Sequence, residues 1–146
     1  MSSSPRDFLE AANCSLNASS VEGDFRAATS RSYYAAYHEA LRVICALPSP
    51  GSVAGSQGSH EQIYEQLRHP TTKSDEMNAH SLALGNVLMG LFASRIRADY
   101  RPQSDFLHRE AKDAYSKAEV FFIGAKTLDA VIGASRKPKL TSTHRK

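Results

Sequence analysis

Residues 30–41, SRSYYAAYHEAL, gather hydroxyl, guanidinium and imidazole groups that could bind an anion or transfer a proton. These groups belong to Arg31, Tyr33, Tyr34, Tyr37 and His38. On a helix, Tyr33 and Tyr37 share one face, and so do Tyr34 and His38, because residues four positions apart are neighbours. Two interpretations stay open. The tyrosines bury their rings at a wet edge of a helical bundle, with Arg31 extended along the surface, or the group lines a polar cleft.

A second polar group, RIRADYR, occupies residues 95–101. Arg95 and Asp99 are four positions apart and can pair on one helix face. An exposed pair would contribute only about 0.3–0.5 kcal/mol. At the edge of a core, however, the five N–H donors of Arg95 would need partners. Arg97 and Arg101 also suit the negative end of a helix without having any function.

Arg101 and His108 form a third candidate, seven positions apart. Histidine can act as a general acid or base near neutral pH, and arginine can hold a phosphate oxygen. Pairs at this spacing are also common by chance. His60 follows a Gly/Ser-rich segment and by itself indicates no chemistry. The chain has no Gly-rich phosphate loop, H-E-x-x-H motif, Cys/His metal pattern or G-x-S-x-G elbow, so we expect neither a metal nor a cofactor.

Helices must carry these side chains, because no stretch alternates with period two as a strand does. The predicted helices cover residues 4–18, 24–47, 60–68, 75–100 and 104–133. Ser4-Pro5 and Ser104-Asp105 are typical of helix starts. Residues 48–59, PSPGSVAGSQGS, are predicted to form a flexible loop. The sequence predicts an all-α, up-and-down helical bundle of four main helices plus one short helix.

Helical spacing predicts which residues form the core of this bundle. The first helix would bury Phe8, Ala11, Ala12 and Leu16, and the fourth Leu82, Gly85, Met89, Phe92 and Ile96. The last helix repeats at heptad spacing through Leu107, Ala111, Ala114, Ala118, Phe121, Ala125, Leu128 and Ile132. The second helix has two neighbouring stripes, Tyr33, Tyr37, Ala40 and Ile44 beside Arg31, Tyr34, His38, Leu41 and Cys45, so we expect it to be central.

Length and composition agree with one globular domain. The chain has 146 residues, 23% of them charged and 41% hydrophobic. No apolar run is long enough for a membrane span, and no secretory signal is visible, so we expect a cytoplasmic protein. Cys14 and Cys45 indicate neither a disulfide framework nor a metal site.

The basic character of the chain resides in its C-terminal end. Residues 134–146 contain five Lys or Arg and no acid, and removing them from the net charge of +3 leaves −2 for the rest. We predict a single helical domain at 4–133 followed by a basic, disordered tail at 134–146. Such a tail could also touch phosphate.

Taken together, these segments resemble the HEPN superfamily (higher eukaryotes and prokaryotes nucleotide-binding). The resemblance rests on Ser30-Arg31-Ser32-Tyr33-Tyr34-Ala35, on Ser59-His60 and on Arg95-Ile96-Arg97-Ala98-Asp99-Tyr100, in that order before an Ala-rich final helix. It covers roughly residues 5–130. The resemblance implies a homodimer with a composite polar cleft, in which the second helix faces the Arg95–Tyr100 segment.

Members of this superfamily often work in toxin–antitoxin or antiviral modules, and the resemblance therefore implies RNA or a nucleotidyltransferase-type antitoxin as partner. Catalytic members are metal-independent endoribonucleases with an R-x(4–6)-H motif. Here Arg101-x6-His108 fits that motif, with Pro102 directly after the arginine. If the chain cleaves RNA, Arg95 or Arg101 would hold phosphate and His108 would transfer the proton. The alternative is a non-catalytic module that binds a nucleotide or partner.

Overall fold

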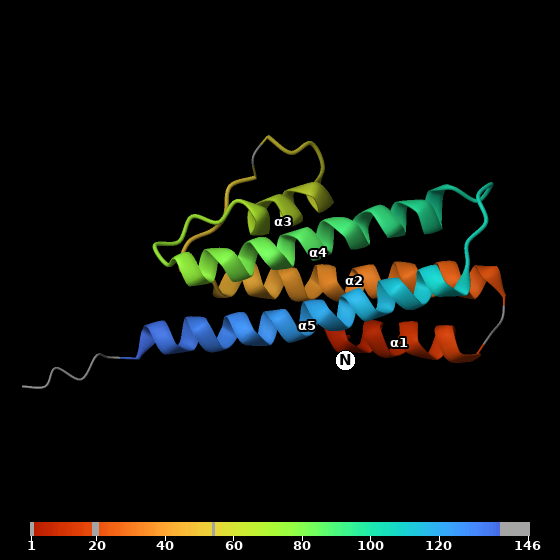
Figure 1. Cartoon of the computed structure of the whole chain (residues 1–146), viewed down its shortest axis with the longest axis horizontal. Coiled ribbons are helices and arrows are strands. Elements are labelled where there is room, and N and C mark those ends of the chain that lie inside the picture. Colours follow the sequence, from red (N-terminus) through yellow and green to blue (C-terminus); the bar gives the residue numbers. More distant parts are fainter. Residues whose placement is uncertain (1, 19–20, 54, 138–146) are drawn as a thin grey trace, which may run out of the picture.

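The computed structural model describes residues 2–18, 21–53 and 55–137, and within them it contains five α helices and no β strand. The helices are α1 (Pro5–Ala18), α2 (Glu22–Ala46), α3 (Ser59–Arg68), α4 (Asp75–Tyr100) and α5 (His108–Arg136). Helix α2 packs against each of the other four, as Figure 1 shows. The predicted all-α bundle with one short helix and a central second helix is therefore confirmed.

The four longer helices alternate in direction. In Figure 1, α1 and α4 run one way along the bundle, whereas α2 and α5 run the other way. The short helix α3 lies beside α4, on the side of the molecule opposite α1, and packs only on α4 and α2. None of the described helices is long and apolar enough to cross a membrane.

The start of α1 agrees with the prediction, whereas the start of α5 does not. The backbone N–H of Ser4 donates to the Asp7 carboxylate (2.6 Å), and the N–H of Asp7 donates to the Ser4 hydroxyl (3.3 Å). Ser104 was expected to cap the last helix, but its hydroxyl donates back to the carbonyl of Arg101 (3.0 Å) within the preceding turn. The helix begins instead at His108, where the Glu110 carboxylate accepts the N–H of Leu107 (2.7 Å).

Helix α5 also continues past the predicted boundary at residue 133. It ends at Arg136, whose guanidinium donates to the carbonyl of Ala46 at the end of α2 (3.0 Å). The rest of the predicted tail, residues 138–146, lies outside the described residues. Residue 54 of the predicted loop at 48–59 is also outside the described residues. The other residues of this loop form no helix before α3 begins at Ser59.

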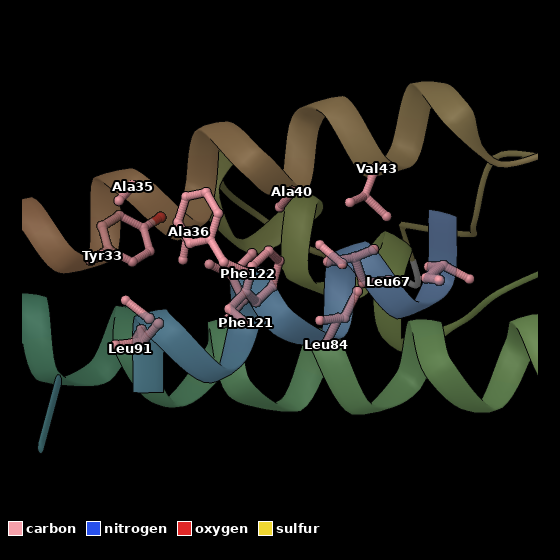
Figure 2. Packing of buried hydrophobic residues seen from close by; sticks show 14 of the residues in the cluster. Tyr33, Ala35, Ala36, Ala40, Val43, Leu67, Leu84, Leu91, Phe121 and Phe122 are labelled. Carbon is pink, nitrogen blue, oxygen red and sulfur yellow. The ribbon is translucent and has the colours of Figure 1, made fainter. Parts of the chain in front are cut away.

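The core is made where α5 lies between α2 and α4. Figure 2 shows Phe121 and Phe122 of α5 beside Tyr33 and Ala36 of α2, with Leu91 of α4 nearby. The heptad seam of α5 is confirmed from Ala111 to Ile132, because all seven of those positions are buried. Leu107 is exposed and its neighbour Phe106 is buried in its place, since residue 107 precedes the helix.

Small side chains explain how α2 comes close to its neighbours. Helix α2 has four fully buried alanines, Ala28, Ala35, Ala36 and Ala40. In α5, Ala114 and Ala118 are at most 1% exposed. Alanines at a contact let two helix axes approach. The predicted stripes of α2 include Ala40 but not Ala28, Ala35 or Ala36. They also include Arg31 and Cys45, both of which are exposed. The first-helix stripe is shifted as well, because Leu9 is buried and Phe8 only half-buried.

The predicted stripe on α4 is also partly wrong. Leu82 and Met89 are exposed, and the buried residues are Met77, Ser81, Leu84, Gly85, Leu88, Leu91, Arg95 and Ala98. Leucine and methionine occur on several faces of this helix, so two stripes fit the spacing equally well. The buried stripe contains polar Ser81, whose hydroxyl donates to the carbonyl of Leu67 at the end of α3 (2.7 Å).

A glycine brings α3 close to α4. A Cβ atom built on Gly85 would lie 2.5 Å from Cγ of Arg68 and 2.8 Å from its backbone nitrogen. The absence of a side chain at Gly85 therefore sets how closely α3 can pack. The position of α3 matters for the site described next, because α3 begins with Ser59 and His60.

Arg26 of α2 holds the C-terminal end of α4. The last carbonyls of a helix have no N–H partner within it. The Arg26 guanidinium donates to the carbonyls of Arg97 (3.2 Å), Ala98 (2.9 Å), Arg101 (3.3 Å) and Ser104. It also pairs with Glu22 (3.0 Å), which accepts the N–H of Phe106 (2.6 Å). One side chain thus joins α2 to the whole turn between α4 and α5.

Candidate functional site

Arg95, near the end of α4, is the centre of the candidate site. It is only 9% exposed. Its Nε donates to the Asp99 carboxylate (3.0 Å), and its Nη2 donates to the hydroxyls of Tyr34 (2.9 Å) and Tyr100 (3.2 Å). The guanidinium carbon also lies 5.3 Å from the ring centre of Tyr34 and 5.2 Å from that of Tyr100. Aromatic rings and hydroxyls therefore fix the orientation of this cation.

Asp99 ties this guanidinium to α2. Its Oδ2 accepts the Nε of Arg95 and also the hydroxyl of Ser30 (3.1 Å). The pair of Arg95 and Asp99 that the four-residue spacing predicted is confirmed. Its partial burial makes it more than a surface pair, since removing one member would leave the other charge without its partner.

Helix α2 contributes the rings around the guanidinium. Tyr33 is fully buried, whereas Tyr34, Tyr37 and His38 are half-buried. Tyr33 and Tyr37 lie 5.9 Å apart between ring centres, and Tyr34 and His38 lie 6.4 Å apart. The rings pack on one another, so the groups expected to line a cleft meet as a cluster at the edge of the core.

Helix α3 adds His60 to this cluster. Nδ1 of His60 lies 2.7 Å from the hydroxyl of Tyr33. Its ring lies 4.8 Å from that of Tyr37 and stacks on Phe92 of α4 at 6.0 Å and 18°. The imidazole of His60 is therefore held by a hydrogen bond from α2 and by rings from α2 and α4.

The environment keeps His60 neutral and Tyr33 protonated. Burial, and then the charge of Arg95, lowers the pKa of His60 below its ordinary value. Burial, and then Tyr37, raises the pKa of Tyr33 far above the usual range of a phenol. Among the described residues the buried hydroxyl of Tyr33 has no other hydrogen-bond acceptor, so it donates to Nδ1 of His60. The imidazole proton then resides on Nε2.

One end of the Arg95 guanidinium remains available to a ligand. Nη1 makes no hydrogen bond to the described residues, and it is not among the buried polar atoms that lack a partner. Nη1 is therefore not completely buried, and it lies beside the half-buried rings. Such an arrangement can donate to an anionic oxygen while a ring of the cluster stacks on a planar group.

Arg31 and Arg97 were predicted to belong to this group, and the structure places both elsewhere. Arg31 turns toward α1, where its Nη1 donates to the Ser15 hydroxyl (2.6 Å). Arg97 lies two residues after Arg95, about 200° around the helix. It pairs with Glu110 (2.7 Å) and lies over Phe106 on the other side of α4. The expected contact of Arg31 with Arg95 and Asp99 is therefore wrong.

Arg101 and His108 also lie apart from the Arg95 cluster. The side chain of Arg101 is exposed and makes no hydrogen bond, ion pair or cation–π contact with the described residues, and its carbonyl is one of those held by Arg26. His108 is exposed at the start of α5, and its ring meets the edge of Phe25 at 5.0 Å. Within the described residues no hydrogen bond or ring contact joins His108 to Arg95 or to Arg101, so the expected catalytic pair stays a prediction.

Three residues of the site were not among the predicted site residues. Ser30 completes the hydrogen bonds of Asp99, Phe92 stacks on His60, and Phe8 of α1 stacks on His38 at 5.2 Å and 20°. The spacing carried a signal for Phe92, which precedes Arg95 by three positions on one helix face. The partner of Phe8 depends on the packing of α1 against α2, which no local pattern specifies.

Among the described residues, no three His, Cys, Asp or Glu side chains gather as a metal-binding group. Cys14 and Cys45 are free and exposed. Comparisons with family models, with curated proteins and with solved structures found no match to this chain.

Proposed function

We propose that this chain is a HEPN-type helical protein of a toxin–antitoxin or antiviral-type module, and that it binds RNA at the Arg95 cluster. The observation that carries the proposal is the Arg95 guanidinium, which is held by Tyr34, Asp99 and Tyr100 and whose Nη1 makes no hydrogen bond to the described residues. Three motifs far apart in the sequence supply this one cluster, which supports the resemblance on which the proposal also rests.

The chemistry of the cluster favours RNA over an isolated phosphate. Asp99 offsets the charge of Arg95, so the attraction for an anion is modest. The half-buried rings add stacking, which contributes about 1–3 kcal/mol per base in single-strand binding proteins. A ligand with both a base and a phosphate uses both features.

Binding is the conclusion, and cleavage is a separate question for experiment. No hydrogen bond or ring contact within the described residues joins His108 to Arg95 or Arg101, whereas proton transfer needs the reacting groups within hydrogen-bond distance. The homodimer and the nucleotidyltransferase-type partner remain part of the proposal. Light scattering of the purified protein tests the homodimer, and co-purification of the two proteins tests the partner.

The proposal is tested with a fluorescein-labelled single-stranded RNA and anisotropy. We expect Arg95→Gln to weaken binding about tenfold or more, because a charge-assisted hydrogen bond is lost. Tyr100→Ala removes a ring that is 63% exposed, so it should weaken binding without disturbing the core. Arg97→Gln is the matched control on the same helix. Equal affinity of all four proteins for RNA would refute the proposal.

A second measurement addresses cleavage. Wild type, Arg95→Ala, Arg101→Ala and His108→Ala are incubated with RNA in the presence of EDTA, and the products are separated on a gel. We expect no product that depends on any of the three residues. Cleavage by wild type that disappears in His108→Ala would show that the chain is a ribonuclease and that a second copy completes the site.

A further inference from the structure

A hollow between α1 and α2 lies next to the Arg95 cluster. It has a volume of about 220 Å³ and is lined by Ser3, Asp7, Phe8, Ala11 and Arg31. Phe8, on its wall, stacks on His38. The hollow therefore combines a half-buried aromatic ring with a cation, which are the two groups that single-strand binding surfaces use.

Arg31 is free to contact a ligand in this hollow. It is exposed, and its single hydrogen bond to the described residues is the one from Nη1 to Ser15. This bond fixes the side chain against α1 and leaves Nε and Nη2 as donors. The one acid on the wall, Asp7, accepts the backbone N–H of Ser4 (2.6 Å) at the start of α1. Arg31 therefore keeps its charge without an ion-pair partner.

A row of rings connects the hollow with Arg95. Phe8 stacks on His38, and the ring of His38 lies 6.4 Å from that of Tyr34. The guanidinium carbon of Arg95 lies 5.3 Å from the ring centre of Tyr34. Two cations, Arg31 and Arg95, thus flank one row of partly exposed rings that extends from α1 across α2 to α4.

We propose that this hollow is a second subsite, which takes a neighbouring nucleotide of the same single-stranded RNA that binds at the Arg95 cluster. A base stacks on the Phe8 and His38 rings, and Arg31 donates to the phosphate that follows it. The inference rests on the proposed function, because the strand is first held at Arg95. It gives Arg31 a role, although the structure removes this residue from the Arg95 cluster.

The experiment compares a mononucleotide with an oligonucleotide. AMP binding is followed by NMR, and binding of a fluorescein-labelled octa-adenylate by anisotropy at several salt concentrations. We expect Arg31→Gln to weaken octa-adenylate binding about tenfold and to reduce its logarithmic salt slope by about 0.7. AMP binding should stay unchanged, because one nucleotide occupies only the Arg95 cluster. Phe8→Leu should weaken octa-adenylate binding while its apolar side chain keeps the α1 packing, and Arg109→Gln, an exposed change on α5, is the control.

Each other outcome has a definite meaning. If wild type binds octa-adenylate and Arg31→Gln binds it equally well, the second subsite is refuted and the proposed function stands. If Arg31→Gln weakens AMP and octa-adenylate equally, the two regions are one site and the second subsite is also refuted. If wild type binds neither probe, the proposed function fails and the second subsite fails with it.

Discussion

The hydroxyl of Tyr33 lies 2.7 Å from Nδ1 of His60, and this hydrogen bond joins the centre of α2 to the first turn of α3. It is the one hydrogen bond between side chains that connects these two helices within the described residues. Helix α3 is also held by apolar contacts, by the Ser81 hydroxyl, by the hydrogen bond from Arg68 to Asn86 (3.0 Å) and by the close approach at Gly85. The position of His60 in the Arg95 cluster is therefore sensitive to few groups.

Tyr33→Phe tests this hydrogen bond directly. The ring and its packing remain, but the buried Nδ1 of His60 loses its donor. We expect a loss of about 0.5–1.5 kcal/mol in the free energy of unfolding. The pKa of His60 should rise, because the donated hydrogen bond favours the neutral imidazole. Urea unfolding measures the first effect and an NMR titration of the His60 ring the second. A wild-type pKa in the variant would contradict the assigned tautomer.

The lowered pKa of His60 makes stability depend on pH. In the folded protein its pKa lies below the ordinary value of 6.5, so the unfolded chain binds a proton more readily. This contribution to stability is full above pH 6.5 and is lost as the pH falls from 6.5 through the folded pKa. Wild type should therefore lose more stability between pH 7.5 and 5 than His60→Gln does. Parallel unfolding curves for the two proteins across this range would contradict the prediction.

Gly85→Ala should separate α3 from α4. The new methyl group meets the backbone nitrogen of Arg68 at 2.8 Å, and a backbone atom cannot move aside by changing rotamer. We expect a loss of about 1–3 kcal/mol, as for other over-packed positions. Gly90→Ala, on the same helix, is the matched control, because a Cβ there meets nothing within 4 Å. That variant should gain about 0.5–1 kcal/mol from helix propensity. Thermal unfolding of both variants measures whether the free energy of unfolding falls in Gly85→Ala and rises in Gly90→Ala.

Arg26→Gln should loosen the end of α4. The guanidinium holds two carbonyls at the end of α4 and two in the turn that follows, and glutamine has too few donors and too little reach to replace it. We expect a loss of about 2 kcal/mol or more, since hydrogen bonds from charged groups are among the stronger ones. Arg109→Gln serves as control. Amide exchange should rise between residues 97 and 106 in Arg26→Gln alone; unchanged exchange there would show that the turn holds without the arginine.

Local sequence patterns predicted where the helices lie in the chain, and they predicted less well which face of each helix packs on its neighbours. Four helix starts lie within two residues of the expected ones, because caps, prolines and glycines act locally. The predicted start of α5 was wrong because Ser104 belongs to the turn between α4 and α5. Arg26 holds this turn through a hydrogen bond between residues 78 positions apart. The predicted buried face of α4 was partly wrong because apolar residues occur on more than one face of this helix. Packing against the neighbouring helices decides which of these faces is buried.

The same distinction applies to the candidate site. The pair of Arg95 and Asp99 follows from its spacing on one helix, and it is confirmed. The position of Arg31 could not follow from spacing, since a residue at the border of two faces turns toward whichever helix packs there. Helix α1 supplies that neighbour through Ser15. The stack of Phe8 on His38 depends on the same packing of α1.

Of the other helices, only α2 and α4 contact α3, and α1 and α5 do not touch it. The other four helices share a core that includes Phe121 and Leu91, and α3 adds to it chiefly Leu67. Detaching α3 would therefore remove His60 from the rings while most of the protein stayed folded. If RNA binds at the Arg95 cluster as proposed, a change at the α3–α4 contact should weaken that binding even where the core of the other four helices stays folded.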